Sequence, residues 1–306
     1  MEKKIAILSG RVSQGLAKKV CQILNLKLIE NNLFQFSDGE MAVKIEGNIR
    51  GKNTYIINST NPPTENLIET LLLVDSVRNH NPLNVTLIIP YFGYSRQDRI
   101  DATSDSINAK VMAKLISAIG ADNVILIDIH SEQILGFFER GIRVKHIEAT
   151  NVIADQVKKK FKGKRYILAS PDLGGVKRVK KISEKIGSCQ YVIFTKSRPK
   201  PNQVDRNAVQ IIGEIKGKET IFIDDMIDTG GTLANAARIA KERGATKVHL
   251  YATHGLFSGE AWKKLKSDNI DSICVCNTLP LNCNLTVGNI RIEGEIAKII
   301  SEENSD

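Results

Sequence analysis

One stretch of the chain decides its fold, and it reads Ile221-Phe222-Ile223-Asp224-Asp225-Met226-Ile227-Asp228-Thr229-Gly230-Gly231-Thr232. The apolar run at its start predicts a buried strand that ends at the two adjacent aspartates. Residues 233–240, which follow, have the composition of a helix. A strand, a tight loop and a helix in this order direct backbone N–H groups and the positive end of a helix dipole at an anion.

The loop and the aspartates suit different parts of one ligand. Gly230 and Gly231 allow the backbone to approach a phosphate closely, and the threonine hydroxyls beside them can donate hydrogen bonds. Asp224 and Asp225 would repel a phosphate, but they suit the hydroxyls of a sugar, or a metal ion that bridges sugar and phosphate. The stretch therefore indicates a site for a phosphorylated sugar.

Length and composition predict a soluble protein of two domains, each of about 150 residues. Hydrophobic residues make up 42% and charged residues 25% of the 306 positions, which is ordinary for globular proteins. No apolar segment is long enough to predict a signal peptide or a membrane span. The five cysteines are scattered without a C-x-x-C pair, so we expect neither disulfides nor a thiolate zinc site, and a cytoplasmic location.

The formal charge of +9 raises the alternative of nucleic-acid binding. Its lysine and arginine clusters, at 158–160, 177–181 and 263–264, lie in helix-like segments, where such clusters are usually solvated faces. Aromatic residues are only 5% of the chain and do not alternate with these clusters, as a base-stacking surface would require. Anionic small substrates explain the charge equally well, so we expect no nucleic-acid partner.

The two halves of the chain repeat one pattern. Residues 5–20 have the strand-then-helix character of residues 166–179, and residues 54–89 have that of residues 220–251. Strands that alternate with helices predict parallel sheets covered on both faces. We therefore expect an α/β fold with two similar domains, at 1–148 and 149–306.

The repeat also indicates which half binds the anion. Where the second copy has Asp224 and Asp225, the first has Asn58 and Ser59, and its loop contains Pro62-Pro63 in place of the glycines. Proline has no N–H to donate to a phosphate. The first loop is therefore predicted to have lost the site.

Four further segments carry candidate site residues, although from the residues alone each has an ordinary structural explanation. Arg96 and Gln97 follow the predicted strand at 85–89, in a loop that is more often surface than site. Residues 34–40 fit an acidic hairpin turn, and His130 ends another strand. Residues 196–202 combine cations with two prolines, as exposed loops do.

Taken together, these motifs resemble those of the ribose-phosphate diphosphokinases, also called phosphoribosyl pyrophosphate synthases. The stretch 221–232 resembles the phosphoribosyl pyrophosphate loop that this family shares with type I phosphoribosyltransferases. A duplication in which only the second loop is intact resembles the diphosphokinases alone. The resemblance covers nearly the whole chain, and it implies two tandem type I phosphoribosyltransferase-like domains, each a mainly parallel sheet flanked by helices.

The resemblance also implies roles for individual residues. It implies a ribose 5-phosphate site at Asp224, Asp225, Asp228, Thr229, Gly230, Gly231 and Thr232, with Arg198 beside it. It implies an ATP site at Phe36, Asp38, Glu40, Arg96 and Gln97, catalytic residues at Lys196, Arg198 and Asn202, and magnesium near His130 and Asp172. It further implies that the hairpin bearing Phe36 reaches a neighbouring subunit, hence a homo-oligomer, with a hexamer built from dimers as the expected form.

The implied reaction moves the diphosphoryl group of ATP to ribose 5-phosphate with magnesium as cofactor. Alternative functions also have to be considered. The chain contains no Walker A or protein-kinase glycine loop. A phosphoribosyltransferase would share the 224–232 motif but would not need the segments at 96 and 196. A catalytically inactive regulatory homologue would be expected to have damaged motifs, and these are intact. At 100–106 the chain departs from the family pattern and lacks regulatory-site arginines, although Arg50 still matches one such position.

Overall fold

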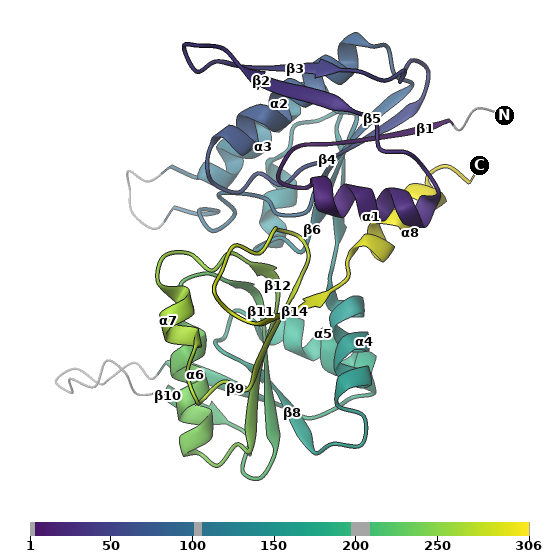
Figure 1. Ribbon diagram of the computed structural model, residues 1–306. Helices are drawn as coiled ribbons and strands as arrows, with labels where there is room; N and C mark the ends of the chain where they lie inside the picture. Colours follow the sequence, from purple (N-terminus) through teal and green to yellow (C-terminus); the bar gives the residue numbers. More distant parts are fainter. Residues whose placement is uncertain (1–3, 101–105, 197–208, 306) are drawn as a thin grey trace. The chain divides into compact units, whose positions relative to one another are not determined.

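The computed structural model describes residues 4–100, 106–196 and 209–305, apart from the side chains of residues 196 and 209. In it the chain forms two compact units, which are drawn in Figure 1. Unit 1 is Met1–Glu148 with Thr278–Pro280 and Ile292–Asp306, and unit 2 is Ala149–Asn277 with Leu281–Arg291.

The sheet of unit 1 has five strands in the order β1-β4-β5-β6-β7, and all its neighbours are parallel. These strands are β1 (Ile5–Ser9), β4 (Asn53–Ile57), β5 (Asn84–Ile89), β6 (Asn123–Ile127) and β7 (Arg143–Ile147). The inner strands β4, β5 and β6 are buried along almost their whole length, as parallel strands covered on both faces should be.

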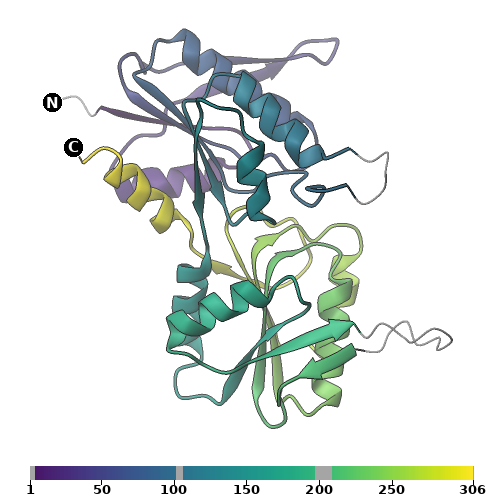
Figure 2. The ribbon, with the colours of Figure 1, turned by 180° about the vertical axis from the view of Figure 1, so that it is seen from behind.

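Helices cover both faces of this sheet (Figures 1 and 2). They are α1 (Gln14–Leu24), α2 (Glu65–Asn79), α3 (Asn108–Ala118), the 3₁₀ helix η1 (Glu132–Phe137) and α8 (Glu293–Glu302). A separate antiparallel hairpin, β2 (Asn31–Gln35) with β3 (Met41–Ile45), packs on α2 through β3.

The C-terminal helix differs from the expected division of the chain. Residues 149–306 were expected to form one domain, but α8 lies beside α1 of unit 1 (Figures 1 and 2). The apolar residues Ile296 and Ile300 of α8 are fully buried, and the hydroxyl of Tyr55 contacts Glu303 and Asn304 at 3.1 and 2.8 Å. The burial of α8 and its hydrogen bonds thus place this helix in unit 1. The division into domains at 1–148 and 149–306 stays a prediction.

The sheet of unit 2 has seven strands in the order β10-β9-β8-β11-β12-β13-β14. Only the edge strand β10 is antiparallel to its neighbour. The strands are β8 (Tyr166–Ser170), β9 (Tyr191–Lys196), β10 (Val209–Ile212), β11 (Glu219–Ile227), β12 (Lys247–Gly255), β13 (Ser272–Cys276) and β14 (Val287–Ile290).

Two helices pack together on each face of this sheet (Figure 1). One pair is α4 (Thr150–Lys160) with α5 (Val176–Ile186), and the other is α6 (Gly231–Glu242) with α7 (Ala261–Leu265). The aliphatic and aromatic side chains of β11, β12 and α6 form much of the core. The rings of Phe194 and Phe222 pack edge-to-face in it, with their centroids 4.9 Å apart. The expected α/β architecture of two mainly parallel sheets is confirmed.

The predicted repeat is also confirmed at the level of elements. In unit 1 the order β4, α2, β5 is matched in unit 2 by β11, α6, β12, and in each unit the two strands are hydrogen-bonded neighbours. The loops that follow β4 and β11 therefore occupy equivalent places, beyond the carboxyl ends of parallel strands, where sheets of this kind bind ligands.

Candidate active site

The apolar pattern predicted that the strand ends at the two adjacent aspartates. The structure differs, because Asp224 and Asp225 lie inside β11, which continues to Ile227. Pairing of β11 with β8 stops at Phe222, whereas pairing with β12 continues to Ile227. The strand therefore stays extended through Asp224 and Asp225 while one of its edges is no longer occupied. After Glu219, Asp224 is the only residue of β11 that is not buried, so this strand presents one carboxylate beside the open edge.

The carboxylate of Asp224 carries an unfavourable negative charge. Burial raises its pKa well above the ordinary value of 3.8, and the negative charge of Asp225 and the hydrogen bond with it raise the pKa further. Asp172 adds to this effect, while the guanidinium of Arg178 opposes it. Such a pair of acids binds a proton, a sugar hydroxyl or a metal cation favourably, because each of these offsets the repulsion.

Backbone hydrogen bonds orient both aspartates. The N–H of Asp225 donates to Oδ1 of Asp224, and the N–H of Met226 donates to Oδ1 of Asp225, both at 2.9 Å. Each bond uses one oxygen of the carboxylate concerned. The site therefore has its acceptors fixed in direction before any ligand is present.

The loop after β11 has the geometry that the glycines predicted. Gly230 has φ +70° and directly precedes α6, and a Cβ at this position would lie 2.8 Å from Cγ of the buried Leu265. A Cβ at Gly231, by contrast, would meet no protein atom within 4 Å. Thr229 and Thr232 are exposed. The first N–H groups of α6 thus begin beside open space, which is the arrangement that binds anions at helix N-termini.

Asp172 occupies the equivalent turn after β8. Its Oδ1 accepts a hydrogen bond from the N–H of Gly175 at 3.0 Å, and its carbonyl accepts one from the Ser170 hydroxyl at 2.6 Å. The side chain is exposed, and its effect on the pKa of Asp224 places it within electrostatic reach of the β11 aspartates. Unit 2 therefore has these three acids in or just after the neighbouring inner strands β8 and β11, with Asp172 close enough to act on the charge of Asp224.

The cluster at 177–181 was interpreted as a solvated basic face, and within it Arg178 is half-buried while Lys177 and Lys180 are exposed. Arg178 lies in the first turn of α5, where its charge favours the ionised form of Asp224. No local signal distinguishes this arginine from the neighbouring Lys177 and Lys180, because the difference lies in how α5 packs beside β11.

Unit 1 contains the predicted nucleotide residues. Arg96 and Gln97 are exposed in the loop between β5 and α3, where the Gln97 N–H donates to the Tyr94 carbonyl at 3.1 Å. The carbonyl of Gln97 accepts from the N–H of Ala109, and its side-chain oxygen accepts from the amide of Asn108. The loop is therefore tied to the start of α3, with Arg96 directed by a backbone held on both sides.

Phe36, Asp38 and Glu40 form the tip of the β2–β3 hairpin. This is the acidic hairpin turn that the residues alone predicted. Phe36 N–H donates to the Glu40 carbonyl at 2.8 Å, and Oδ1 of Asp38 accepts from the Glu40 N–H at 3.0 Å. Phe36 is 53% exposed, although its ring meets that of Phe34 edge-on at 5.3 Å. An exposed aromatic ring on an ordered turn is consistent with recognition of a planar ligand.

The other predicted residues are described in part. His130 is exposed just after β6, at the carboxyl end of the unit 1 sheet. Lys196 ends β9, and its side chain, together with Arg198 and Asn202, lies outside the described residues. Among the residues that the structure describes, no three His, Cys, Asp or Glu side chains converge as a metal site. A bound Mg²⁺ would therefore need water and substrate oxygens as further ligands, which is usual for this ion.

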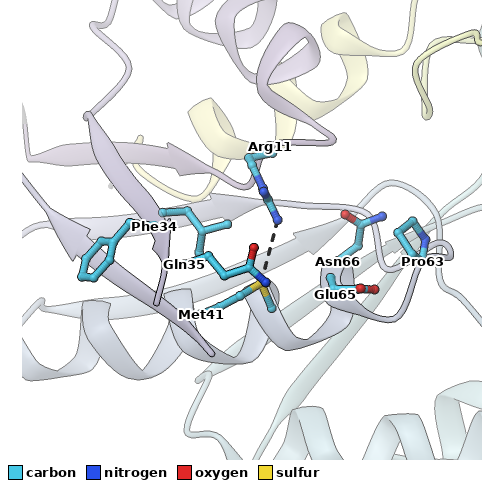
Figure 3. A pocket seen from close by; sticks show the side chains of 8 residues that line it. Arg11, Phe34, Gln35, Met41, Pro63, Glu65 and Asn66 are labelled. Atoms are coloured by element: carbon cyan, nitrogen blue, oxygen red, sulfur yellow. Dashed lines mark hydrogen bonds between the residues drawn. The ribbon is translucent and has the colours of Figure 1, made fainter. Parts of the chain in front are cut away.

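A cavity of about 510 Å³ lies in unit 1, away from most of the predicted residues. As Figure 3 shows, it is bordered by the hairpin, the start of α2 and Arg11, whose guanidinium lies 3.9 Å from the sulfur of Met41. In the repeat Arg11 stands where unit 2 has Asp172. Its backbone N–H and its Nε donate to the buried carboxylate of Glu69, at 2.8 and 3.4 Å. The equivalent place in unit 1 thus has an internally paired cation in place of the acid Asp172, a difference that sequence reasoning missed.

Comparisons with known proteins match almost the whole chain. Residues 5–120 match the family model "N-terminal domain of ribose phosphate pyrophosphokinase", and residues 181–303 match "Phosphoribosyl synthetase-associated domain". The ribose-phosphate pyrophosphokinase of Pasteurella multocida is 40% identical over 97% of this chain and 95% of its own. That of Aquifex aeolicus is 41% identical over 90% and 88%.

A solved structure extends the similarity to the fold. The crystal structure of phosphoribosylpyrophosphate synthetase from Mycobacterium smegmatis has a TM-score of 0.89 and 28% sequence identity, covering 99% of this chain and 100% of that one. Among the residues described here, no helix is long and apolar enough to cross a membrane. Sequence and fold thus agree with the resemblance, and the chain belongs to the ribose-phosphate pyrophosphokinase family.

Proposed function

We propose that the protein transfers the diphosphoryl group of ATP to the anomeric hydroxyl of ribose 5-phosphate. The products are 5-phosphoribosyl 1-diphosphate, for nucleotide biosynthesis, and AMP. The observation that supports this most directly is the pair Asp224 and Asp225, fixed in β11 immediately ahead of the N-terminus of α6. Membership of the ribose-phosphate pyrophosphokinase family supports the same reaction.

Ribose 5-phosphate binds across the β11 edge in this proposal. Its 5-phosphate lies on the loop of Asp228, Thr229, Gly230, Gly231 and Thr232, where the open space beside Gly231 admits a ligand. Asp224 and Asp225 accept hydrogen bonds from the ribose hydroxyls or hold a bridging cation, which offsets the burial and repulsion that raise the pKa of Asp224. Arg198 supplies a further cation for this substrate.

ATP binds through residues of unit 1. Phe36 contacts the adenine ring, and Asp38 and Glu40 accept hydrogen bonds from the amino group or the ribose. Arg96 presents a planar fork of donors to the phosphate oxygens, and Gln97 can donate and accept hydrogen bonds at once. The exposure of Phe36, Arg96 and Gln97 supports these roles.

His130 and Asp172 are the residues proposed to hold magnesium. Oxygen donors such as the fixed Asp172 carboxylate fit this ion, and so does the excess negative charge around Asp224. When bound, the ion would neutralise phosphate charge and lower the pKa of the attacking hydroxyl, so that no side chain is required as general base.

The chemical step is an in-line displacement at the β-phosphorus of ATP. The anomeric oxygen forms a bond to this phosphorus, the bond to the oxygen that joins it to the α-phosphate breaks, and AMP leaves with the electron pair. Positioning and cations promote such steps more than covalent chemistry does. Lys196 and Arg198 are the proposed catalytic cations, and Asn202 belongs to the same segment.

The assembled form and its location follow from the resemblance. We expect a homo-oligomer, a hexamer built from dimers, in which the exposed hairpin tip at Phe36 reaches a neighbouring subunit. The expected location is the cytoplasm, without membrane or nucleic-acid partners.

One assay tests the reaction against its alternatives. The protein is incubated with ATP, Mg²⁺ and ribose 5-phosphate, and AMP is measured. Formation of AMP that depends on ribose 5-phosphate is expected. A phosphoribosyltransferase would instead consume 5-phosphoribosyl 1-diphosphate with a nucleobase, and an inactive regulatory homologue would form neither product. A nucleic-acid protein would bind polyanions with strong salt dependence.

A further inference from the structure

Ser59 lies in unit 1 at the position where the repeat has Asp225 in unit 2, and it is completely buried. Its hydroxyl accepts a hydrogen bond from the Tyr91 N–H and donates one to the Thr278 carbonyl, both at 3.0 Å. Its own N–H donates to the hydroxyl of Ser13 at 3.0 Å. Ser59 thus joins three separate segments of its own unit, two through its hydroxyl and one through its backbone N–H.

A hydroxyl makes both of these bonds through one oxygen atom. An ionised carboxylate at Ser59 could accept from the Tyr91 N–H, but it could not donate to the Thr278 carbonyl. Serine therefore suits an internal connection, just as aspartate suits a sugar hydroxyl at the equivalent place in unit 2.

The next residue, Thr60, holds the same partner segment. Its N–H donates to the Tyr91 carbonyl at 2.9 Å, and its hydroxyl accepts from the Gly93 N–H at 2.8 Å. The two backbones approach so closely that a Cβ on Gly93 would lie 2.0 Å from the Thr60 carbonyl oxygen. Ser59 and Thr60 together make hydrogen bonds to both ends of the Tyr91–Gly93 backbone.

This backbone leads directly into the loop that carries Arg96 and Gln97. Only Tyr94 and Ser95 separate Gly93 from Arg96, and Tyr94 has the unusual φ of +63°. Few free torsions remain between the anchored segment and the two exposed side chains. A displacement of residues 91–93 would therefore move Arg96 and Gln97.

We propose that Ser59 and Thr60 are positioning residues for ATP. Through hydrogen bonds to Tyr91 and Gly93 they set the place of the loop bearing Arg96 and Gln97, while neither residue touches the substrate. This inference rests on the proposed function for the ATP role of Arg96 and Gln97. In this proposal, the residues of unit 1 that are equivalent to the sugar site of unit 2 hold the ATP-binding loop in position.

The test uses the full-length protein with Ser59→Ala, Thr60→Val and Thr60→Ser. Ser117→Ala is the matched control, because the Ser117 hydroxyl also accepts from a backbone N–H, that of Glu139, and donates to a carbonyl, that of Ala113. For each protein, KM is measured for ATP and for ribose 5-phosphate, ATP binding is titrated in the presence of Mg²⁺, and thermal unfolding is recorded.

Each of Ser59→Ala and Thr60→Val loses one hydrogen bond from a backbone N–H of residues 91–93, which predicts a rise of about five- to tenfold in KM and Kd for ATP. KM for ribose 5-phosphate should stay within about twofold, because none of the hydrogen bonds removed involves the proposed sugar-site residues 224–232. Thr60→Ser should restore the affinity for ATP. The KM and Kd of Ser117→Ala for ATP should equal those of the unchanged protein, even if its melting temperature is lower. If Ser59→Ala does not fold, Thr60→Val carries the test, since it keeps the shape of the side chain.

The two possible failures are distinguishable. An unchanged protein that binds ATP and forms AMP, with variants of equal ATP affinity or with equal losses for both substrates, overturns the positioning role alone. An unchanged protein that binds no ATP overturns the proposed function and this inference together.

Discussion

The loop after β4 and the loop after β11 stand at equivalent places in the two units, yet their polar groups have different partners. In unit 1, Ser59 and Thr60 bond to the backbone of residues 91–93 and to Thr278. In unit 2, Asp224 and Asp225 accept one backbone N–H each, and the raised pKa of Asp224 shows that negative charge remains to be offset. The same backbone arrangement thus supports internal packing in one unit and, in the proposed function, ligand binding in the other.

The difference extends to the residues that start the following helix. Gly230 takes a left-handed conformation before α6, and Gly231 leaves open space beside it. The equivalent loop of unit 1 contains Pro62 and Pro63, which cannot donate an N–H to an anion. Once a duplicated loop no longer binds a ligand, its polar positions are free to stabilise a neighbouring loop.

The largest expected effect concerns the cations Lys196, which ends β9, and Arg198, which comes two residues later in the sequence. Lys196→Ala and Arg198→Ala should each lower turnover by about 10²- to 10³-fold, because they remove charge that stabilises the transition state. Lys185→Ala, in the last turn of α5, is the control. The measurement is kcat at saturating substrates together with the melting temperature. Near-normal turnover in both variants would remove the catalytic role of this segment.

Next in size is the effect of filling the open space at the start of α6. Gly231→Val should weaken ribose 5-phosphate binding by roughly 10²-fold and ATP binding far less, because the side chain would displace the phosphate. Gly15→Val is the control, since this glycine also lies in the first turn of a helix, with nothing within 4 Å of its Cβ position. Separate titrations of the two ligands decide. Equal losses for both would show that the loop serves the nucleotide.

Exchanging the residues of the two copies should change stability in opposite directions. Asn58→Asp in unit 1 should cost about 1–3 kcal/mol, because the buried Asn58 amide donates to the Thr70 hydroxyl and the Asn66 carbonyl, and a carboxylate could donate to neither. Asn58→Ser is the comparison variant. Denaturant unfolding measures the cost, and an Asn58→Asp protein as stable as the unchanged one would contradict the internal role of this loop.

Asp224→Asn in unit 2 should stabilise the protein at neutral pH while reducing binding of ribose 5-phosphate. Folding raises the pKa of Asp224 well above the ordinary value of 3.8. In the pH window between the ordinary and the raised pKa, the folded state therefore binds more protons than the unfolded state. Stability is therefore lost as pH rises through that window, and asparagine avoids the loss. The melting temperature of Asp224→Asn at neutral pH should therefore be higher than that of the unchanged protein.

The pH dependence of this gain is the decisive measurement. The difference in melting temperature between Asp224→Asn and the unchanged protein should shrink as the pH falls toward 3.8, the ordinary pKa. A gain that is constant with pH would show that it does not arise from ionisation of Asp224.

The smallest expected effect is regulation by phosphate and ADP. Residues 101–105 lie outside the described part of the chain, and their sequence replaces expected arginines with Asp, Ala, Thr and Ser. Binding a multiply charged anion without converging cations is costly. Phosphate should therefore change the rate only weakly, and ADP should compete with ATP. Sigmoidal ATP curves with strong phosphate dependence would mean that other residues form a regulatory site.

Local pattern was sufficient to predict the elements of the repeat but not the surroundings of the site. The apolar run at 221–223 and the glycines at 230 and 231 predicted β11, the loop and α6, because these signals act over neighbouring residues. That β11 continues past Asp224 depends on pairing with β12, which no local signal reports. Arg178 depended on how α5 packs, and the partners of Ser59 lie 32 and 219 residues away.

Unit 1 has a consequence for how the chain is made. Its last helix, α8, emerges after all of unit 2, and the hydrogen bonds of Asn304 to Asn53 and Tyr55 close over residues made near the start. At roughly 5–20 residues per second, the surface of α1 that α8 covers stays open for about 8–30 s after residue 148 is added. Unit 2 can finish folding in that interval. The half that leaves the ribosome first is therefore the last to be completed.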